Sequence, residues 1–185
     1  SNYAPCILEK KLPLEIEVSV ITARSMSGNH VFFPIAENEH VNGILDTTIS
    51  PGRVSDDIAC KVRKYAQEIA IKLNYVGVLA VEFFIIGDNV YINEIAPRPH
   101  NSGHYSLDAC TNNQFDLQVR ALTDLELLDP GFHSNTVMIN LLGDTWFKEN
   151  KFRDPNFNIL VNEPSVNLHM YGKEEPRKGR KMAHF

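Results

Sequence analysis

The sequence predicts an α+β domain with a largely antiparallel sheet and flanking helices. Three observations favour this class. Strand-like alternation fills the first quarter of the chain, a clearly helical segment and an apolar hairpin follow it, and strand-like segments return after a second helix. We expect the chain to end in a small β-rich subdomain.

Composition excludes several classes of function. The chain has 185 residues, 43% of them hydrophobic and 22% charged, with a formal net charge of −5. This charge gives no general attraction to nucleic acid or to an anionic membrane. There is no signal-peptide pattern, and no apolar run approaches the roughly 20 residues that a membrane span needs. We therefore expect a cytoplasmic protein.

The cysteines predict neither a disulfide framework nor a zinc site. Cys6, Cys60 and Cys110 are odd in number and widely spaced, and they lie in apolar or amphipathic segments. A C-x-x-C spacing is absent. Reduced, buried thiols are the expected state.

Three strands are expected before the first helix. The stretch LEIEVSVIT, residues 14–22, alternates apolar and polar side chains as a half-buried strand does. Further strands are expected over residues 30–35 and 44–49. The polar stretch ENEHVN, residues 37–42, is expected to be a loop.

Two helices are expected in the middle of the chain. The first begins after Ser55, whose side-chain oxygen can accept from free backbone amides, and ends near Asn74 as its C-cap. Between these ends, apolar residues recur at helical spacing: Ile58, Val62, Tyr65, Ala66, Ile69 and Leu73. A second helix is expected over residues 106–122, with a looser periodicity.

The C-terminal part predicts short elements. The stretch TVMINLL, residues 136–142, is a compact apolar strand that ends at a glycine. A short helix over residues 144–151 would pack Trp146 inward. Residues 166–171 alternate again, as a strand does.

An apolar hairpin over residues 77–96 carries one carboxylate on each strand, Glu82 and Glu94. A three-residue turn at Gly87-Asp88-Asn89 would place these two acids directly opposite each other. The same register would pair Ile86 with Val90 and Phe84 with Ile92. A two-residue turn would shift the register by one and weaken the argument.

Two opposed carboxylates have Cβ atoms about 4.5–5.5 Å apart and repel each other. A hard divalent cation would relieve this repulsion, because Mg²⁺ binds carboxylate oxygens together with water and substrate phosphates. The alternative is that both acids face solvent or pair with nearby Lys or Arg. We expect a magnesium site at Glu82 and Glu94.

The loop after the hairpin, residues 97–104, concentrates chemically active side chains. Arg98, His100 and His104 follow the second acid, where two prolines restrict the backbone. A fixed guanidinium beside a metal site suits a small planar anion or a phosphate, through bidentate hydrogen bonds. The alternative is a purely structural role for Arg98 and His100.

The motif INEIAPRPHNSGHYSLDAC, followed by QVRALTDLELL, closely resembles the signature of the 5-(carboxyamino)imidazole ribonucleotide synthases. These are ATP-dependent enzymes of the ATP-grasp superfamily. The resemblance extends to ILEKKLPLEIEVSVITAR, VFFPIAENEHVNGIL, VMINLLG and GRKMAHF, with one departure at Ala183, where the family pattern has glycine. It implies an ATP-grasp part over residues 1–130 and a C-terminal β-rich subdomain over residues 131–185. By the same resemblance, we expect the family's N-terminal domain to be absent from this chain.

The resemblance implies that ATP lies between two antiparallel sheets. Glu9, Lys10, Lys11 and Leu12 would meet the adenine, partly through backbone groups. Glu17 would hold the ribose hydroxyls and His40 would lie near the phosphates. Mg²⁺ would be bound by Glu82 and Glu94, beside Asn93.

The implied reaction joins ATP, bicarbonate and 5-aminoimidazole ribonucleotide through carboxyphosphate, in de novo purine synthesis. Arg98 would orient bicarbonate or the transferring phosphate. His100 would be its hydrogen-bonding partner and a proton acceptor, since a pKa near 6.5 suits proton transfer at neutral pH. The residues expected to position substrate are Asn101 and Ser102, for the substrate or the loop, and Lys173, Arg180 and Lys181, for the ribotide phosphate. The alternative for the basic tail is a solvated charge run.

The same resemblance implies a homodimer and an incomplete active site in this chain. Enzymes of the family are about twice as long, with phosphate-binding lysines and a glycine-rich loop that this chain does not supply. We expect the isolated chain to bind ATP weakly and not to turn over. The competing functions are a non-catalytic nucleotide-binding module and an ATP-grasp ligase that acts on another amine.

Overall fold

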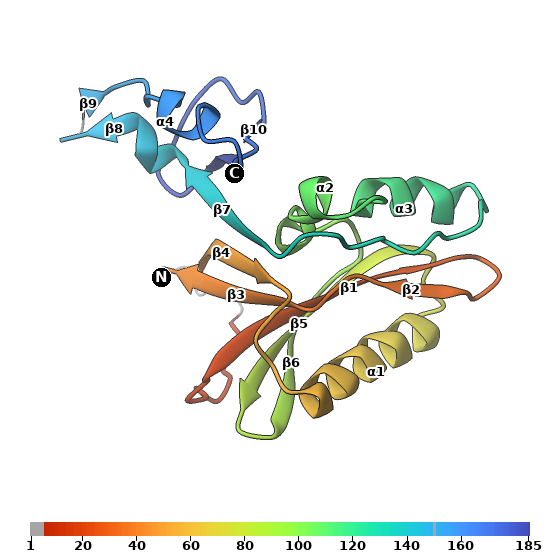
Figure 1. Cartoon of the computed structure of the whole chain (residues 1–185). Coiled ribbons are helices and arrows are strands. Elements are labelled where there is room, and N and C mark those ends of the chain that lie inside the picture. The colour runs from red at the N-terminus through yellow and green to blue at the C-terminus, as the bar shows by residue number, and fades with distance from the viewer. Residues whose placement is uncertain (1–5, 150) are drawn as a thin grey trace.

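The computed structural model describes residues 6–149 and 151–185. Within these residues nine strands form one sheet, in the order β10-β11-β7-β4-β3-β1-β5-β6, with β2 paired to the free part of β1. All of these pairings are antiparallel. Helices flank the sheet (Figure 1), so the predicted fold class is confirmed.

The first part of the chain contains β1 (Ile16–Arg24), β2 (His30–Phe32), β3 (Ala36–Val41), β4 (Ile44–Ser50), α1 (Asp56–Lys72), β5 (Gly77–Ile86) and β6 (Asn89–Ala96). The middle contains a short 3₁₀ helix η1 (Asn101–Gly103), α2 (Ser106–Ala109) and α3 (Gln114–Leu122). The last part contains β7 (Thr136–Leu142), η2 (Gly143–Trp146), β8 (Phe147–Lys148), β9 (Lys151–Phe152), α4 (Asn158–Val161), β10 (His169–Met170) and β11 (Lys181–His184).

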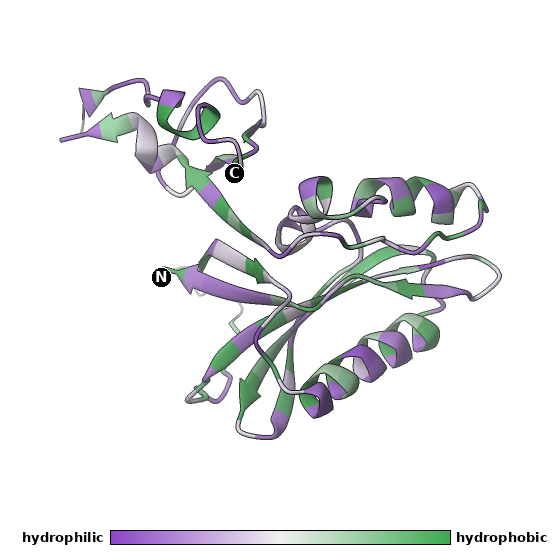
Figure 2. Ribbon diagram, viewed as in Figure 1, coloured by the Kyte–Doolittle hydropathy of each residue, from purple (hydrophilic) through white to green (hydrophobic). Residues whose placement is uncertain are grey.

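The sheet has two covered faces. On one face, alternate residues of β1 and β5 pack against α1, whose buried residues are Ile58, Val62, Ala66 and Ala70. On the other face, the intervening residues of the same strands pack under α2 and α3, against Tyr105 and Leu117. Figure 1 shows the two helical layers on opposite sides of the sheet, and Figure 2 shows apolar strands between them. This second face continues beyond its helices, and the continuation holds the candidate site.

The first helix forms as the sequence predicts. The backbone amide of Ile58 donates to Ser55 Oγ at the N-cap, and Asp56 and Asp57 lie at the positive end of the helix dipole. The C-cap is Leu73, one residue before the predicted Asn74, which instead adopts a φ of 45° just beyond it.

Two predicted segments differ in the structure. Residues 37–42 are not a loop, because β3 pairs with both β1 and β4, with an irregularity between Glu39 and His40. Residues 106–122 are not one helix. An isolated bridge from Cys110 to Phe132 separates α2 from α3, and Asn113 begins α3 with a capping box.

The C-terminal elements are shorter than predicted. Over residues 144–151 only η2 is helical and β8 and β9 follow it, although Trp146 is buried as expected; residue 150 lies outside the described residues. The strand over residues 166–171 shrinks to β10. The division of the chain at residue 131 stays a prediction, and β7 joins the same sheet as β4 across that boundary.

Only one of the three cysteines is buried. Cys110 lies in the core, whereas Cys6 and Cys60 are exposed, so the predicted burial is wrong for those two. Cys60 lies on the solvent side of α1, where the helical spacing of its neighbours places it. In the described part of the chain, no helix is long and apolar enough to cross a membrane.

Candidate functional site

The hairpin of β5 and β6 brings Glu82 opposite Glu94, as predicted, but with a different turn and register from those predicted. The turn has two residues, because Ile86 pairs with Asn89, so the predicted three-residue turn and its pairs Ile86–Val90 and Phe84–Ile92 are wrong. A bulge between Glu82 and Phe83 then restores the register. Phe83 pairs with Ile92 and Glu82 with Glu94, which leaves Asn93 as the extra residue.

The two acids differ in burial. Glu82 is 8% exposed, whereas Glu94 is exposed. Burial raises the pKa of Glu82, and the charges of Glu94 and Glu17 raise it further, against the opposing effects of His40 and Lys181. A buried carboxylate beside like charges binds a cation favourably, because the cation removes the repulsion that disfavours ionisation.

The pair fits Mg²⁺ by the chemistry of its donors, which are hard carboxylate oxygens. Among the residues described, no group of three or more His, Cys, Asp or Glu side chains is arranged to hold a metal. Two protein carboxylates are nevertheless a usual set for Mg²⁺, which takes its other ligands from water and phosphate.

A cavity of about 460 Å³ opens beside the two acids. It gathers side chains that are distant in the sequence but were predicted to act together. Its lining residues are His40, Gly43, Ile44, Leu45, Glu82, Glu94, Arg98, His100, Lys173, Gly179 and Lys181. This cavity therefore joins both carboxylates to cations of the loop and of the C-terminal tail.

A second cavity of about 370 Å³ adjoins it, lined by Arg98, Pro99, His100, Asn101, His104, Tyr171, Lys173 and Lys181. Four of these residues line both cavities. The amide nitrogen Nδ2 of Asn101 is buried without a hydrogen-bond partner. That nitrogen is closed to solvent and does not itself face the cavity. The cationic side chains Arg98, Lys173 and Lys181 make the cavity suited to an anion.

Glu17 and His40 contact each other across β1 and β3, through a carboxylate oxygen and Nδ1. Both line a third cavity of about 290 Å³, together with Leu14, Glu15, Ile16, Glu37, Asn38 and Glu39. His40 also lines the cavity beside Glu82. The strand that replaces the predicted loop therefore links the ribose and phosphate positions expected from the sequence.

The loop of residues 97–104 is fixed by buried hydrogen bonds. Ser19 Oγ donates to Ser102 Oγ at 2.8 Å, and Ser102 Oγ lies 2.9 Å from His100 Nδ1. Ser102 is fully buried, so its hydroxyl positions the loop and is not free to contact a substrate. His100 Nδ1 also lies 3.8 Å from a carboxylate oxygen of Glu82.

The pKa of His100 is lower than the ordinary value that the sequence suggested. Burial lowers it to about 4, with further contributions from the charges of Arg98, Lys181 and His40. His100 is therefore neutral at pH 7 and able to accept a hydrogen bond or a proton, although as a weak base.

The C-terminal tail supplies two of its three predicted cations. Lys173 Nζ donates to the carbonyl of Lys181 at 2.5 Å and lies 5.2 Å from the centre of the Tyr171 ring. Burial lowers the pKa of Lys181. Arg180 lines neither of the two joined cavities, and its guanidinium donates to the carbonyl of Glu175.

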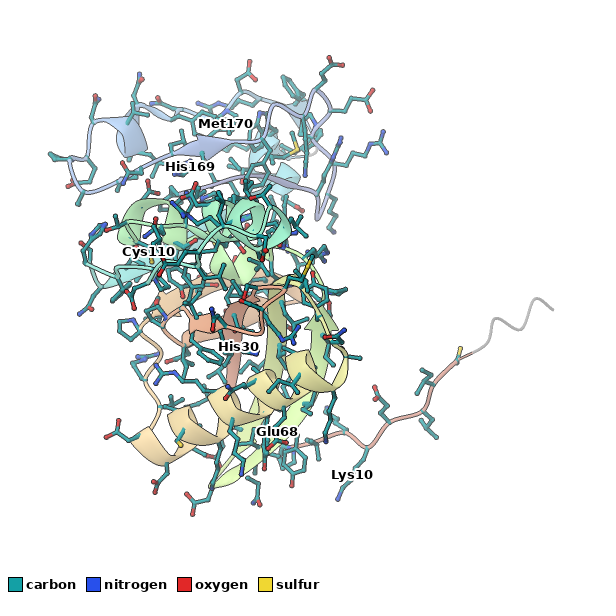
Figure 3. All side chains as sticks on the ribbon, turned by 90° about the vertical axis from the view of Figure 1, so that its right-hand side faces the viewer. Lys10, His30, Glu68, Cys110, His169 and Met170 are labelled. Atoms are coloured by element: carbon teal, nitrogen blue, oxygen red, sulfur yellow. The ribbon has the colours of Figure 1, made fainter. Side chains whose placement is uncertain are left out.

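Four predicted nucleotide residues lie outside these cavities. Glu9, Lys10, Lys11 and Leu12 belong to an irregular segment before β1, and Figure 3 shows Lys10 on a stretch that extends away from the body. Asn93 is exposed at the bulge of β6. The roles of these residues stay predictions.

Sequence reasoning missed Gln114 and Ser19. Both are fully buried polar residues that hold the loop of residues 97–104. Gln114 is the first residue of a helix, and Ser19 alternates with apolar residues in a strand. Neither position differs in sequence pattern from one that faces solvent.

Comparison with known proteins identifies the class. Residues 1–115 match the family model of the ATP-grasp domain. The chain therefore belongs to the ATP-grasp family. Residues 136–185 match a second model, the phosphoribosylaminoimidazole carboxylase C-terminal domain.

The particular relatives confirm the predicted resemblance. The N5-carboxyaminoimidazole ribonucleotide synthases of Brucella melitensis biotype 1 and Bacillus subtilis (strain 168) are each 44% identical, over 99% and 100% of this chain and 49% and 47% of theirs. The solved ADP complex of purK, N5-carboxyaminoimidazole ribonucleotide synthetase, superposes with a TM-score of 0.85 at 46% identity, over 95% of this chain and 45% of that one.

A relative from Aspergillus clavatus, solved in complex with ADP and 5-aminoimidazole ribonucleotide, has a TM-score of 0.79 at 28% identity. The match covers 92% of this chain and 46% of that chain. The chain thus spans about half the length of the curated relatives it matches.

Proposed function

We propose that this chain forms part of an ATP-dependent carbon–nitrogen ligase. The reaction would carboxylate 5-aminoimidazole ribonucleotide with bicarbonate, through carboxyphosphate, to give N5-carboxyaminoimidazole ribonucleotide in cytoplasmic purine synthesis. The observation that carries the proposal is the cavity beside the hairpin, where Glu82 and Glu94 meet Arg98, His100 and Lys181. A homodimer is proposed from the family resemblance alone.

In this proposal Glu82 and Glu94 hold Mg²⁺. When bound, the ion would supply positive charge to the phosphates of ATP, which phosphoryl transfer requires. The burial of Glu82 supports this role, because it makes the carboxylate dependent on a nearby cation. Glu94 remains accessible to the ligand from the open side of β6.

Arg98 and Lys181 bind the reacting anions. A guanidinium can form two parallel hydrogen bonds to bicarbonate, which holds it for attack on the γ-phosphoryl group. Lys181 lies beside both cavities and neutralises charge as the carboxyphosphate forms. His100, neutral at pH 7, accepts a hydrogen bond from the bicarbonate or from the amine of the ribotide.

The adjoining cavity binds the ribotide. Lys173 and Lys181 attract its phosphate, and Asn101, which lines the same cavity, helps to position the substrate. We assign Arg180 a supporting role on the tail, because its guanidinium donates to the carbonyl of Glu175. Ser102 positions the loop.

Glu17 and His40 bind the nucleotide, with the ribose nearer to Glu17 and the phosphates nearer to His40. Their mutual contact and the cavity that they share support this assignment. Glu9, Lys10, Lys11 and Leu12 would approach the adenine from the segment before β1, partly through backbone groups, and Asn93 would lie beside the metal.

The test is ADP release by the full-length gene product that carries this chain. We expect release to require both bicarbonate and 5-aminoimidazole ribonucleotide, and Arg98→Lys to lower it at least about 100-fold, because the bidentate contact is lost. Lys64→Ala, on the exposed side of α1, is the matched control and should leave the rate unchanged. ADP release that is independent of the ribotide, or faster with glycinamide ribonucleotide, would contradict the proposal.

A further inference from the structure

Gln114 is a fully buried glutamine that bonds to the backbone of the loop residue His100. The amide nitrogen of His100 donates to Gln114 Oε1 at 2.8 Å, and Gln114 Nε2 donates to the carbonyl of His100 at 2.9 Å. Gly103 makes room for this side chain, since a Cβ there would lie 2.6 Å from Gln114 Oε1. The loop and the start of α3 are therefore built around one amide group.

These two bonds fix the orientation of the amide. A backbone N–H can only donate and a backbone carbonyl can only accept, so the two ends of the Gln114 side chain are not interchangeable. The second N–H of Nε2 is then directed at His104 Nδ1, 2.9 Å away. Because Nε2 of glutamine has no acceptor capacity, His104 Nδ1 accepts and the ring proton resides on Nε2.

His104 lines the ribotide cavity together with Arg98, Lys173 and Lys181. Its ring stacks on His184 and on Phe115, with centroid distances of 5.1 Å and 5.8 Å, so it is held at a fixed angle. Burial, with the nearby charges of His100, Lys181 and His169, lowers its pKa to about 4, so the ring is neutral at pH 7.

The other ring nitrogen, Nε2, is free to meet a ligand. No hydrogen bond to it is present among the residues described, and it is not one of the polar atoms sealed from solvent without a partner. The cavity thus has a neutral N–H donor among three cationic side chains. A donor of this kind adds direction to the binding of a phosphate without adding charge.

We propose that His104 donates a hydrogen bond from Nε2 to a phosphate oxygen of the ribotide, and that Gln114 is the positioning residue that fixes this tautomer. The inference rests on the proposed function for the identity of the ligand. The tautomer itself rests only on the hydrogen bonds of the loop. The two parts can therefore be tested separately.

The tautomer is tested on the 185-residue chain labelled with ¹⁵N-histidine. Long-range ¹H–¹⁵N correlations distinguish a protonated ring nitrogen from an unprotonated one, and His104→Gln assigns the signals by their loss. We expect Nδ1 of His104 to be unprotonated and Nε2 to be protonated at pH 7. A protonated Nδ1 would overturn the inference.

The role of Gln114 is tested by Gln114→Glu, which has nearly the same shape. A carboxylate accepts where the amide donated, so the proton of His104 should move to Nδ1, a change that packing alone would not produce. An unchanged tautomer in the folded variant would contradict a positioning role. The His104 variants described next keep the ligand contact testable even if this buried charge prevents folding.

The contact is tested on the full-length gene product that carries this chain, by calorimetric titration with 5-aminoimidazole ribonucleotide. His104→Phe keeps a stacked ring without a donor and should weaken binding about tenfold or more, because a hydrogen bond to a charged group is lost. His104→Gln places an amide N–H close to the position of Nε2 and should stay within about threefold of the native affinity. Equal affinity of His104→Phe and the native chain would overturn the contact and leave the proposed function intact. If the native full-length gene product does not bind the ribotide at all, both the proposed function and the contact are overturned.

Discussion

Two regions supply cations to the same pair of cavities, the loop of residues 97–104 and the tail of residues 171–181, and they are held in different ways. The loop is fixed by fully buried side chains, Ser102 and Gln114, through bonds to Ser19, His100 and His104. The tail is fixed mainly by exposed bonds, such as that from Lys173 to the carbonyl of Lys181. Groups that need a fixed direction therefore lie on the buried network, and groups that mainly supply charge lie on the tail.

The largest effect should come from Gln114→Leu, which breaks the loop network. It leaves the amide of His100 and Nδ1 of His104 without partners, whereas the carbonyl of His100 keeps its bond from the amide of Gly103. We expect the free energy of unfolding to fall by about 2–6 kcal/mol, since each of the two buried groups left unpaired costs about 1–3 kcal/mol. Urea denaturation measures this, with the exposed Gln67→Leu on α1 as the control. A loss below about 1 kcal/mol would show that the network does not hold the loop.

His104 of the loop stacks on His184 of β11, which stacks on His169 of β10. This stack should make stability depend on pH. His184 is 2% exposed, and its burial, together with the charges of His104 and His169, lowers its pKa to about 4 against the opposing effect of Asp108. The unfolded chain, with a pKa of about 6.5, then binds a proton that the folded chain does not. The contribution of His184 to the free energy of unfolding is complete above pH 6.5 and is lost as the pH falls toward about 4.

Between about pH 6.5 and pH 5 we expect a loss on the order of 2 kcal/mol from His184. The variant His184→Phe should make this part of the stability curve less steep, while His100 and His104, whose pKa values are also lowered to about 4, keep their contributions. His133→Phe, at an exposed position, should leave the slope unchanged. A slope that is the same in all three proteins would contradict the assignment.

Substitutions at two glycines, Gly103 in the loop and Gly172 in the tail, compare how tightly the two regions are packed. Gly103→Ala brings a Cβ against the buried Gln114 amide and should cost about 1–3 kcal/mol through overpacking. At Gly172 the space around a Cβ is open, and the cost there comes only from its φ of 65°, about 1 kcal/mol. Equal costs measured by urea denaturation would mean that the loop is no more tightly packed than the tail.

The smallest effect on folding should come from Lys173→Met. The side chain is exposed, so the free energy of unfolding should change by no more than about 0.5 kcal/mol. Affinity for the ribotide should nevertheless fall, and it should become less sensitive to salt, because a charge has been removed. A large loss of stability without a change in salt dependence would make Lys173 a structural residue.

The sequence was sufficient for the sheet, for α1 and for the opposed acids, because alternation, capping and a two-carboxylate hairpin are local signals. The sequence did not predict how the hairpin brings Glu82 and Glu94 opposite each other. A two-residue turn and a bulge compensate each other there, and no local pattern specifies the bulge. It also failed for β3, whose side chains are mostly polar, such as His40 at the site and Glu37 paired with Arg53, so that the sequence pattern is that of a loop.

The residues that position the loop could not be predicted for a different reason. Ser19 and Gln114 are polar residues whose partners lie 83 and 14 positions away in the chain, at Ser102 and His100. Burial of a polar group depends on which segments the fold brings together, and the sequence does not state this directly. Arg180 was predicted to bind the phosphate because it lies in the basic tail. Its guanidinium instead donates to the carbonyl of Glu175, a near neighbour in the chain.

The most direct test of the account is the thermal stabilisation of the 185-residue chain by Mg²⁺ and ATP, measured for the native chain and for Glu94→Ala. Glu68→Ala, on the outer side of α1 (Figure 3), is the control. A ligand that binds only the folded chain stabilises it by RT ln(1 + [L]/Kd), which raises the melting temperature. We predict a rise of a few degrees for the native chain and for Glu68→Ala, and none for Glu94→Ala. Equal stabilisation of all three would contradict the claim that the opposed acids of the hairpin hold the metal and its nucleotide.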